Sequence, residues 1–167
     1  MNIQLLFLFG IFGLFVVMGV YIYLNYTMRK KFFDDVLAFC NHLIIEISFS
    51  KNNLSSIIER YSQTYAKHFR SVVEGYNALL KQKHDITPES LNHIMWARLK
   101  ANERQQLVNF FYELGRHGCV EEHEKLMASK QSFQNFHASS VAALRKEASI
   151  YLKLCIIVGI GAVILLI

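Results

Sequence analysis

The chain has 167 residues, of which 53% are hydrophobic, and it carries a formal net charge of +5. This length favours a single domain, and three scattered cysteines do not make the disulfide framework of a small secreted protein. Residues 1–28 and 154–167 contain no Asp, Glu, Lys or Arg. We therefore expect an N-terminal transmembrane anchor over 1–28, a domain over 29–153 and a C-terminal transmembrane segment over 154–167.

The first apolar segment has the length of a membrane span. Leu5–Leu24 is an uncharged run of 20 residues, and at about 1.5 Å per residue it crosses the roughly 30 Å hydrocarbon layer. A cleaved signal peptide is the alternative. It would need a positive charge before the run and small residues after it, whereas this run has no preceding charge and ends among Tyr21, Tyr23 and Tyr26. Aromatic residues are typical of a membrane interface, so an anchor is favoured.

Basic residues flank both apolar segments on their inner sides. They are Arg29, Lys30 and Lys31 after the first segment, and Arg145, Lys146 and Lys153 before the second. The positive-inside rule then predicts a cytoplasmic domain with both termini outside the cell membrane. The same residues make the lipid bilayer a better partner for the net charge than nucleic acid, since basic residues do not interleave with aromatic ones in a nucleic-acid pattern.

Apolar residues recur at helical spacing throughout the domain. The pattern predicts helices over 32–49, 54–66, 69–81 and 88–99, a fifth helix that ends near Leu114, and a sixth from Val120 to Ile167. No stretch alternates as a strand would. The expected fold class is therefore all-α, a cytoplasmic bundle of about six helices between an N-terminal and a C-terminal transmembrane helix.

Local signals mark several of these helix ends. Thr87 followed by Pro88 is a strong helix start, Asn102 is expected to cap the fifth helix, and Gly115 stands where a C-terminal cap belongs. Trp96, the one tryptophan, is expected to anchor the core rather than to bind a ligand.

The sixth helix is amphipathic in its first part and apolar on all sides in its last part. Its predicted buried stripe consists of Leu126, Phe133, Phe136, Val141, Leu144, Ala148 and Tyr151. From Leu154 onward the helix is apolar all round, and no Pro or Gly-rich linker intervenes. We interpret it as one rod that carries the domain into the bilayer. Because 154–167 has only 14 residues, a half-inserted or re-entrant tail is the alternative.

Little in the sequence supports catalysis. It has no phosphate loop, nucleophile elbow or HExxH motif, so we expect no enzymatic activity. His117, Cys119 and His123 are of types that bind zinc, but three ligands fall short of a closed zinc site. A metal- or redox-responsive membrane sensor at these residues is therefore an alternative function, against the simpler interpretation of a turn with exposed histidines.

A channel or pore subunit is a third hypothesis. The first span contains no ionisable residue, and its Gly10, Gly13 and Gly19 suit helix contact better than conduction. We rank this hypothesis lowest.

Three stretches carry a resemblance to a known family. In chain order they are Glu46-Ile47-Ser48-Phe49-Ser50 leading to Leu54, Ile57 and Ile58; Glu113-Leu114-Gly115; and Tyr151-Leu152-Lys153-Leu154 leading to Gly159, Gly161 and 164–167. Each is short, but their order, the chain length and the two apolar ends together resemble the stage III sporulation protein AB family. One corner departs from it: where the family has a Ser/Thr-Asp type cap for the last helix, this chain has Arg116-His117-Gly118-Cys119.

The resemblance implies a non-enzymatic part without a cofactor. The family's cytoplasmic domain is similar to the helical bundles of the type II secretion inner-membrane platform protein, the F component. It implies an adapter that docks a cytoplasmic secretion-type ATPase to the mother-cell membrane during sporulation, beside other membrane proteins of a secretion-like channel complex. The periodicity and charge independently predict a bundle on a membrane rod, which suits that role.

Candidate contact groups for such a partner are carboxylates and their neighbours at the bundle's corners. They are Glu46, Glu113, Leu114, Gly115, Glu121, Glu122 and Glu124. Each has a structural interpretation as well. Glu46 flanks a buried stripe and could simply pair with a Lys or Arg of a neighbouring helix, which we favour. The three glutamates at the start of the sixth helix lie where the helix dipole stabilises carboxylates.

Overall fold

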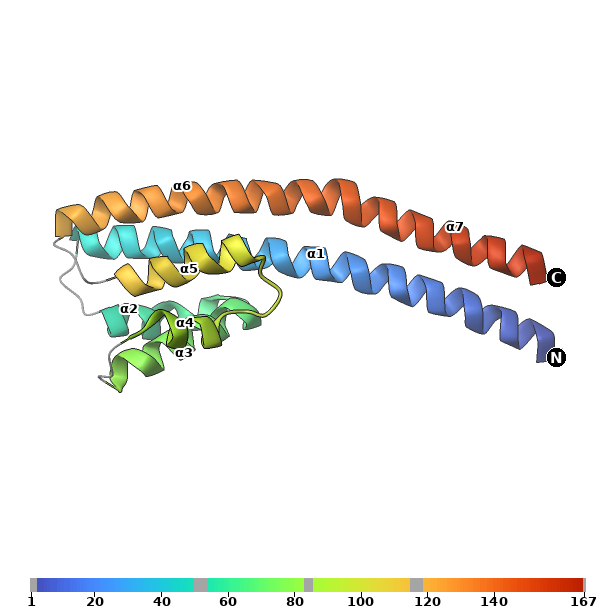
Figure 1. Ribbon diagram of the computed structural model, residues 1–167, viewed down its shortest axis with the longest axis horizontal. Coiled ribbons are helices and arrows are strands. Elements are labelled where there is room, and N and C mark those ends of the chain that lie inside the picture. The colour runs from blue at the N-terminus through green and yellow to red at the C-terminus, as the bar shows by residue number, and fades with distance from the viewer. Residues whose placement is uncertain (1–2, 50–53, 83–85, 115–118, 167) are drawn as a thin grey trace. The chain divides into compact units, whose positions relative to one another are not determined.

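The computed structural model describes residues 3–49, 54–82, 86–114 and 119–166, and every regular element in that part of the chain is helical (Figure 1). The elements are α1 (Ile3–Phe49), α2 (Leu54–Tyr61), a 3₁₀ turn (Ser62–Thr64), α3 (Lys67–Lys81), α4 (Pro88–Ile94), α5 (Ala101–Glu113), α6 (Cys119–Ala143), a π-helical turn (Leu144–Ala148) and α7 (Ser149–Leu166). The all-α prediction is confirmed. Two compact units result: Lys31–His137, here called the bundle, and Met1–Lys30 with Ala138–Ile167, here called the hairpin.

The bundle is built around aromatic side chains. Those that are fully buried are Phe32, Phe33, Phe39, Phe69, Tyr76, Phe111 and Phe133. The Phe39 ring of α1 lies 5.8 Å from that of Phe69 in α3 and 5.9 Å from that of Phe111 in α5, measured between ring centroids. Aromatic pairs at these separations add to the stabilisation from burial. Phe39 therefore joins three helices of the core.

Helix ends in the bundle follow the predictions in part. Thr87 caps α4 as expected: its hydroxyl accepts from the Ser90 backbone N–H at 3.3 Å. The cap predicted at Asn102 is wrong, since α5 already begins at Ala101. The Glu103 carboxylate accepts from the Lys100 backbone N–H at 3.0 Å, which satisfies a donor that the helix start leaves without an intrahelical partner. Gly115 lies outside the described residues.

Two predicted helices are shorter than expected. The second stops at Tyr61 and continues as the 3₁₀ turn, while the fourth stops at Ile94 instead of Leu99. Met95 has extended backbone, with φ −70° and ψ 146°. The chain beyond it buries Met95 and Leu99, and the Trp96 ring stacks on Phe32 at 5.2 Å. Trp96 thus packs against the core, as predicted.

Beyond Ser140 the last helix buries only part of the predicted stripe: Ala148 is buried as predicted, while Val141 and Leu144 are half-buried. Its buried residues include Leu126, Phe133, Ser140, Ala148, Cys155 and Gly159. The spacing is seven residues up to Ser140, eight from Ser140 to Ala148, and seven again to Cys155. The extra residue coincides with the π-helical turn, which acts as a one-residue insertion. The prediction that Tyr151 is buried is therefore wrong; its side chain is 47% exposed.

The hairpin pairs the first part of α1 with α7 in antiparallel register. The Tyr26 hydroxyl donates to the Glu147 carboxylate at 2.9 Å. Further along, a Cβ at Gly19 would lie 3.1 Å from the Cβ of Cys155, and one at Gly159 would lie 3.1 Å from the Phe12 ring. Small residues at a helix contact allow this close approach. Both helices are long and apolar enough to cross a membrane, and in Figure 1 the N and C labels lie at the same end of the pair.

Candidate partner-docking corner

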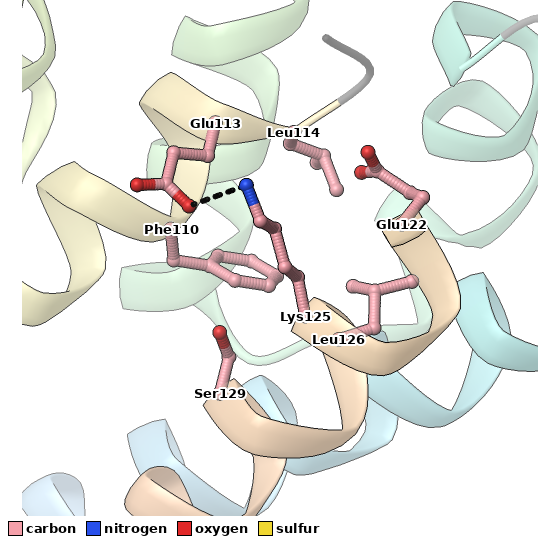
Figure 2. A pocket seen from close by; sticks show the side chains of 7 residues that line it. All are labelled: Phe110, Glu113, Leu114, Glu122, Lys125, Leu126 and Ser129. Carbon is pink, nitrogen blue, oxygen red and sulfur yellow. Dashed lines mark ion pairs between the residues drawn. The ribbon is translucent and has the colours of Figure 1, made fainter. Parts of the chain in front are cut away.

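The corner where α5 ends and α6 begins gathers most of the predicted contact residues. Helix α5 ends at Glu113, because Leu114 has extended backbone with ψ 123°. The Lys125 ammonium on α6 lies 3.4 Å from the Glu121 carboxylate, one turn earlier. It also lies 3.9 Å from the Glu113 carboxylate of α5, as Figure 2 shows. Lys125 therefore links the two helices through charge. Lys125 was not among the predicted contact residues, although its i, i+4 spacing from Glu121 is recognisable in the sequence.

These residues divide into an exposed and a buried group. The side chains of Glu113 and Glu121 are 54% and 60% exposed, and Glu124 is also exposed. Leu114 and Glu122 are buried. Three carboxylates thus reach solvent, while Leu114 and Glu122 belong to the packing beneath them. Gly115 lies outside the described residues.

A small pocket lies within this corner. Its lining consists of Phe110, Glu113, Leu114, Glu122, Lys125, Leu126 and Ser129 (Figure 2). Its free volume of about 20 Å³ accommodates roughly one water molecule. Sites for small organic ligands are typically about 300 Å³ or more. The described corner thus fits a surface contact better than a cofactor.

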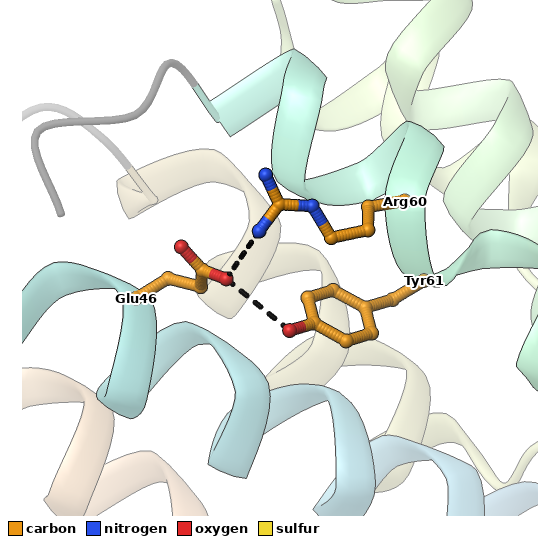
Figure 3. Close-up of polar contacts among 3 residues, drawn as sticks. All are labelled: Glu46, Arg60 and Tyr61. Carbon is orange, nitrogen blue, oxygen red and sulfur yellow. Dashed lines mark hydrogen bonds and ion pairs between the residues drawn. The ribbon is translucent and has the colours of Figure 1, made fainter. Parts of the chain in front are cut away.

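Glu46 lies in an intramolecular ion pair. The Arg60 guanidinium donates to its carboxylate at 2.9 Å, and the Tyr61 hydroxyl donates to the same oxygen at 3.2 Å (Figure 3). The Glu46 side chain is 10% exposed and that of Arg60 is 56% exposed. The interpretation of Glu46 as a carboxylate paired with a neighbouring helix is confirmed. It attaches α2 to α1.

The Glu46–Arg60 pair belongs to a larger group of polar side chains that the sequence did not predict to meet. The Tyr61 ring stacks on His42 at 4.0 Å, and His42 Nδ1 lies 2.8 Å from the Tyr65 hydroxyl. Burial lowers the pKa of His42, although the Glu46 carboxylate opposes this. The spacing of His42 and Glu46, one turn apart on α1, was the available signal. Their partners come from elsewhere in the chain, so periodicity alone could not pair them.

A second carboxylate on α1 also binds the α2–α3 connection. Asp35 accepts a hydrogen bond from the Ala66 backbone N–H at 2.8 Å. Burial raises the pKa of Asp35, against the lowering effect of that hydrogen bond. This contact holds the start of α3 against α1, as the Glu46 contact holds the end of α2.

The hypothetical metal site cannot be assembled from the described side chains. His117 lies outside the described residues, as does the side chain of Cys119, and His123 is half-buried on α6. Within the described part of the chain, no group of three His, Cys, Asp or Glu residues could hold a metal ion. The sensor hypothesis therefore gains no support here and stays a prediction.

Comparison with known proteins gives one match. The profile of a family described as stage III sporulation protein AB matches residues 4–167, which is nearly the whole chain. No curated protein and no solved structure matches. The match takes in both units, the acidic corner and the Glu46 contact.

Proposed function

This chain belongs to the stage III sporulation protein AB family, and from that premise we propose that it is a non-enzymatic adapter of a secretion-like sporulation complex. It docks a cytoplasmic secretion-type ATPase to the mother-cell membrane. Other membrane proteins of the same complex are its further partners. The family supports the sporulation role, while the ATPase is the partner that the resemblance to secretion platform proteins implies.

The observation that carries the docking proposal is the corner formed by Glu113, Glu121 and Glu124. These three side chains are exposed, yet the backbone beneath them is held by buried Leu114 and by Lys125 bridging α5 and α6. A fixed group of like charges attracts a surface of opposite sign and orients it on approach. We therefore expect a basic patch on the ATPase.

The hairpin supplies the attachment to the membrane. It exposes many large apolar side chains, among them Leu14, Val17, Ile157 and Ile164, each 68–69% exposed. Such a surface is unfavourable in water and suits lipid. With the basic residues at one end of the hairpin, the positive-inside rule puts the bundle in the cytoplasm and both termini outside.

A recruitment assay tests the adapter. The full chain is reconstituted in liposomes and incubated with the cytoplasmic ATPase of the same sporulation complex, and the ATPase that floats with the vesicles is measured. We expect recovery with the natural chain and a loss of tenfold or more with Glu113→Lys/Glu124→Lys. The matched control is Glu74→Lys/Glu89→Lys, because both residues are exposed on other helices of the bundle.

Folding of each variant is checked by the fluorescence of Trp96, which lies against the bundle core. Equal loss of recruitment in the control would mean that net charge, and not this corner, attracts the ATPase. No recruitment by the natural chain would remove the docking proposal while leaving the family assignment intact.

A further inference from the structure

Nearly all of the net charge belongs to the smaller unit. The hairpin contains five Lys and Arg residues and one carboxylate, whereas the bundle contains 13 basic and 12 acidic residues. The hairpin therefore carries +4 of the overall +5, and the bundle is close to neutral. Its basic residues are here called the basic collar: Arg29, Lys30, Arg145, Lys146 and Lys153.

The helix register brings Arg29 and Lys30 to the level of Arg145 and Lys146, while Lys153 lies about two turns further along the chain. The hydrogen bond from Tyr26 to Glu147 fixes which turns of the two helices face each other. Arg29 follows Tyr26 by three residues, and Arg145 precedes Glu147 by two. Because the helices are antiparallel, both arginines lie within about one turn of that hydrogen bond and on the same side of it.

Within the hairpin, the exposed cations that follow Ala143 outnumber the carboxylates. Glu147 is the hairpin's one carboxylate, and it accepts the Tyr26 hydroxyl. Arg145, Lys146 and Lys153 are exposed, and none of them forms an ion pair with another described residue within the hairpin. Such a concentration of exposed cations favours an anionic partner.

Apolar surface adjoins the cations on the same helix. Tyr151, Leu154 and Ile157 are 47%, 54% and 68% exposed. The π-helical turn at 144–148 contributes to this arrangement, since its extra residue turns Tyr151 away from the buried stripe. Cations followed by exposed apolar side chains match a phospholipid, whose phosphate adjoins its acyl chains. An acidic protein or a nucleic acid would leave that apolar surface uncovered.

We propose that the basic collar is a binding site for the phosphate groups of anionic phospholipids, which selects these lipids into the layer that surrounds the hairpin. Each Lys or Arg near an anionic membrane surface contributes about fivefold to binding. The inference needs only that the hairpin lies in the bilayer, and it is independent of the ATPase.

The test uses the full chain reconstituted in phosphatidylcholine bilayers with a trace of spin-labelled lipid. Electron paramagnetic resonance measures how strongly the protein's lipid layer prefers labelled phosphatidylglycerol to labelled phosphatidylcholine. We expect a preference of about threefold or more for phosphatidylglycerol, which Arg145→Gln/Lys146→Gln/Lys153→Gln reduces towards one. Raising the salt to 1 M should weaken it as well, through screening.

The matched control is Lys67→Gln/Lys100→Gln, two exposed lysines of the bundle. It removes charge from the other unit and should leave the preference unchanged. Circular dichroism confirms that the helices of each variant remain. Equal binding of the two labelled lipids by the natural chain overturns the proposal, and so does a control that loses the preference as fully as the collar variant.

Discussion

The bundle and the hairpin are both helical, but they are held together by different means. The bundle buries large aromatic side chains and joins its helices through polar contacts such as Glu46 with Arg60. The hairpin brings its helices close at Gly19 and Gly159, and it leaves its large apolar side chains on the outside. Burial from water stabilises the first unit, whereas the second depends on close packing and on lipid around it. Loss of a large buried side chain should therefore be the most harmful change in the bundle, and enlargement of a small residue the most harmful change in the hairpin.

The largest effect is expected in the bundle core. Phe39→Ala removes a fully buried ring that contacts aromatic residues of α3 and α5, and should lower the free energy of unfolding by about 3–5 kcal/mol. Denaturant titration of the full chain in micelles measures this through Trp96 fluorescence. Ile45→Ala is the control, because that side chain is 55% exposed and its loss should change the free energy by less than about 0.5 kcal/mol. Similar losses in both would contradict the proposed core.

In the hairpin, replacing a small residue by a large one should be harmful. Gly159→Leu places a large side chain where even a Cβ would lie 3.1 Å from Phe12, and overpacking of this kind costs about 1–3 kcal/mol. Fluorescent dyes are attached to cysteines introduced at Leu24 and Ile150, in a chain without its native cysteines. Energy transfer between the dyes measures the distance between the two helices, and it should fall in Gly159→Leu. Gly161→Leu should have little effect, because nothing lies within 4 Å of a Cβ there.

Ion pairs within the bundle should differ according to burial. Arg60→Ala removes a guanidinium from the Glu46 carboxylate, which is 10% exposed, and should cost about 1–2 kcal/mol. Lys81→Ala breaks a shorter pair with Glu59, at 2.6 Å, but both of those side chains are more than half exposed. That change should leave the free energy of unfolding nearly unaltered. Chemical denaturation of both variants compares them, and equal effects would show that burial does not determine the strength of the Glu46 pair.

The smallest effect concerns pH. Burial lowers the pKa of His42, so the folded protein resists protonation of this residue more than the unfolded chain does. Its contribution to stability is present above the unfolded pKa of about 6.5 and is lost as the pH falls through the lower folded value. Thermal unfolding from pH 7.5 to 5 should show a decline that is smaller in His42→Gln. An unchanged slope in that variant would assign the decline to other groups.

The sequence was sufficient for most of the architecture because apolar spacing and caps are local properties. Thr87 followed by Pro88 marked a helix start correctly. The core contains apolar residues of α1 from Phe32 to Leu43, and it contains Leu107, Phe110 and Phe111 of α5. Asn102 failed as a cap because Glu103 provides a competing one that acts on Lys100. Tyr151 failed because a periodicity argument assumes an unbroken α-helix, and the π-helical turn violates that assumption.

The candidate site was only partly predictable for a different reason. Spacing identified carboxylates near helix ends, and Glu113, Glu121 and Glu124 do reach solvent. It could not distinguish them from Glu122, which points into the packing between α5 and α6 (Figure 2). Nor could it join His42 to Tyr65, because that contact spans 23 residues. Which side chains meet across helices depends on tertiary packing.

The π-helical turn also bears on how this sequence can change over generations. One residue of an α-helix corresponds to a rotation of about 100°. The π-helical turn absorbs one extra residue within 144–148, so Cys155 and Gly159 stay on the face that contains Ser140. Losing that residue would give a regular α-helix with seven-residue spacing from Ser140 onward, and the same face would still meet α1. Losing a residue between Ala148 and Cys155 would instead rotate Cys155 and Gly159 off that face. Homologous chains should therefore lack one residue within 144–148 more readily than in the turns that follow.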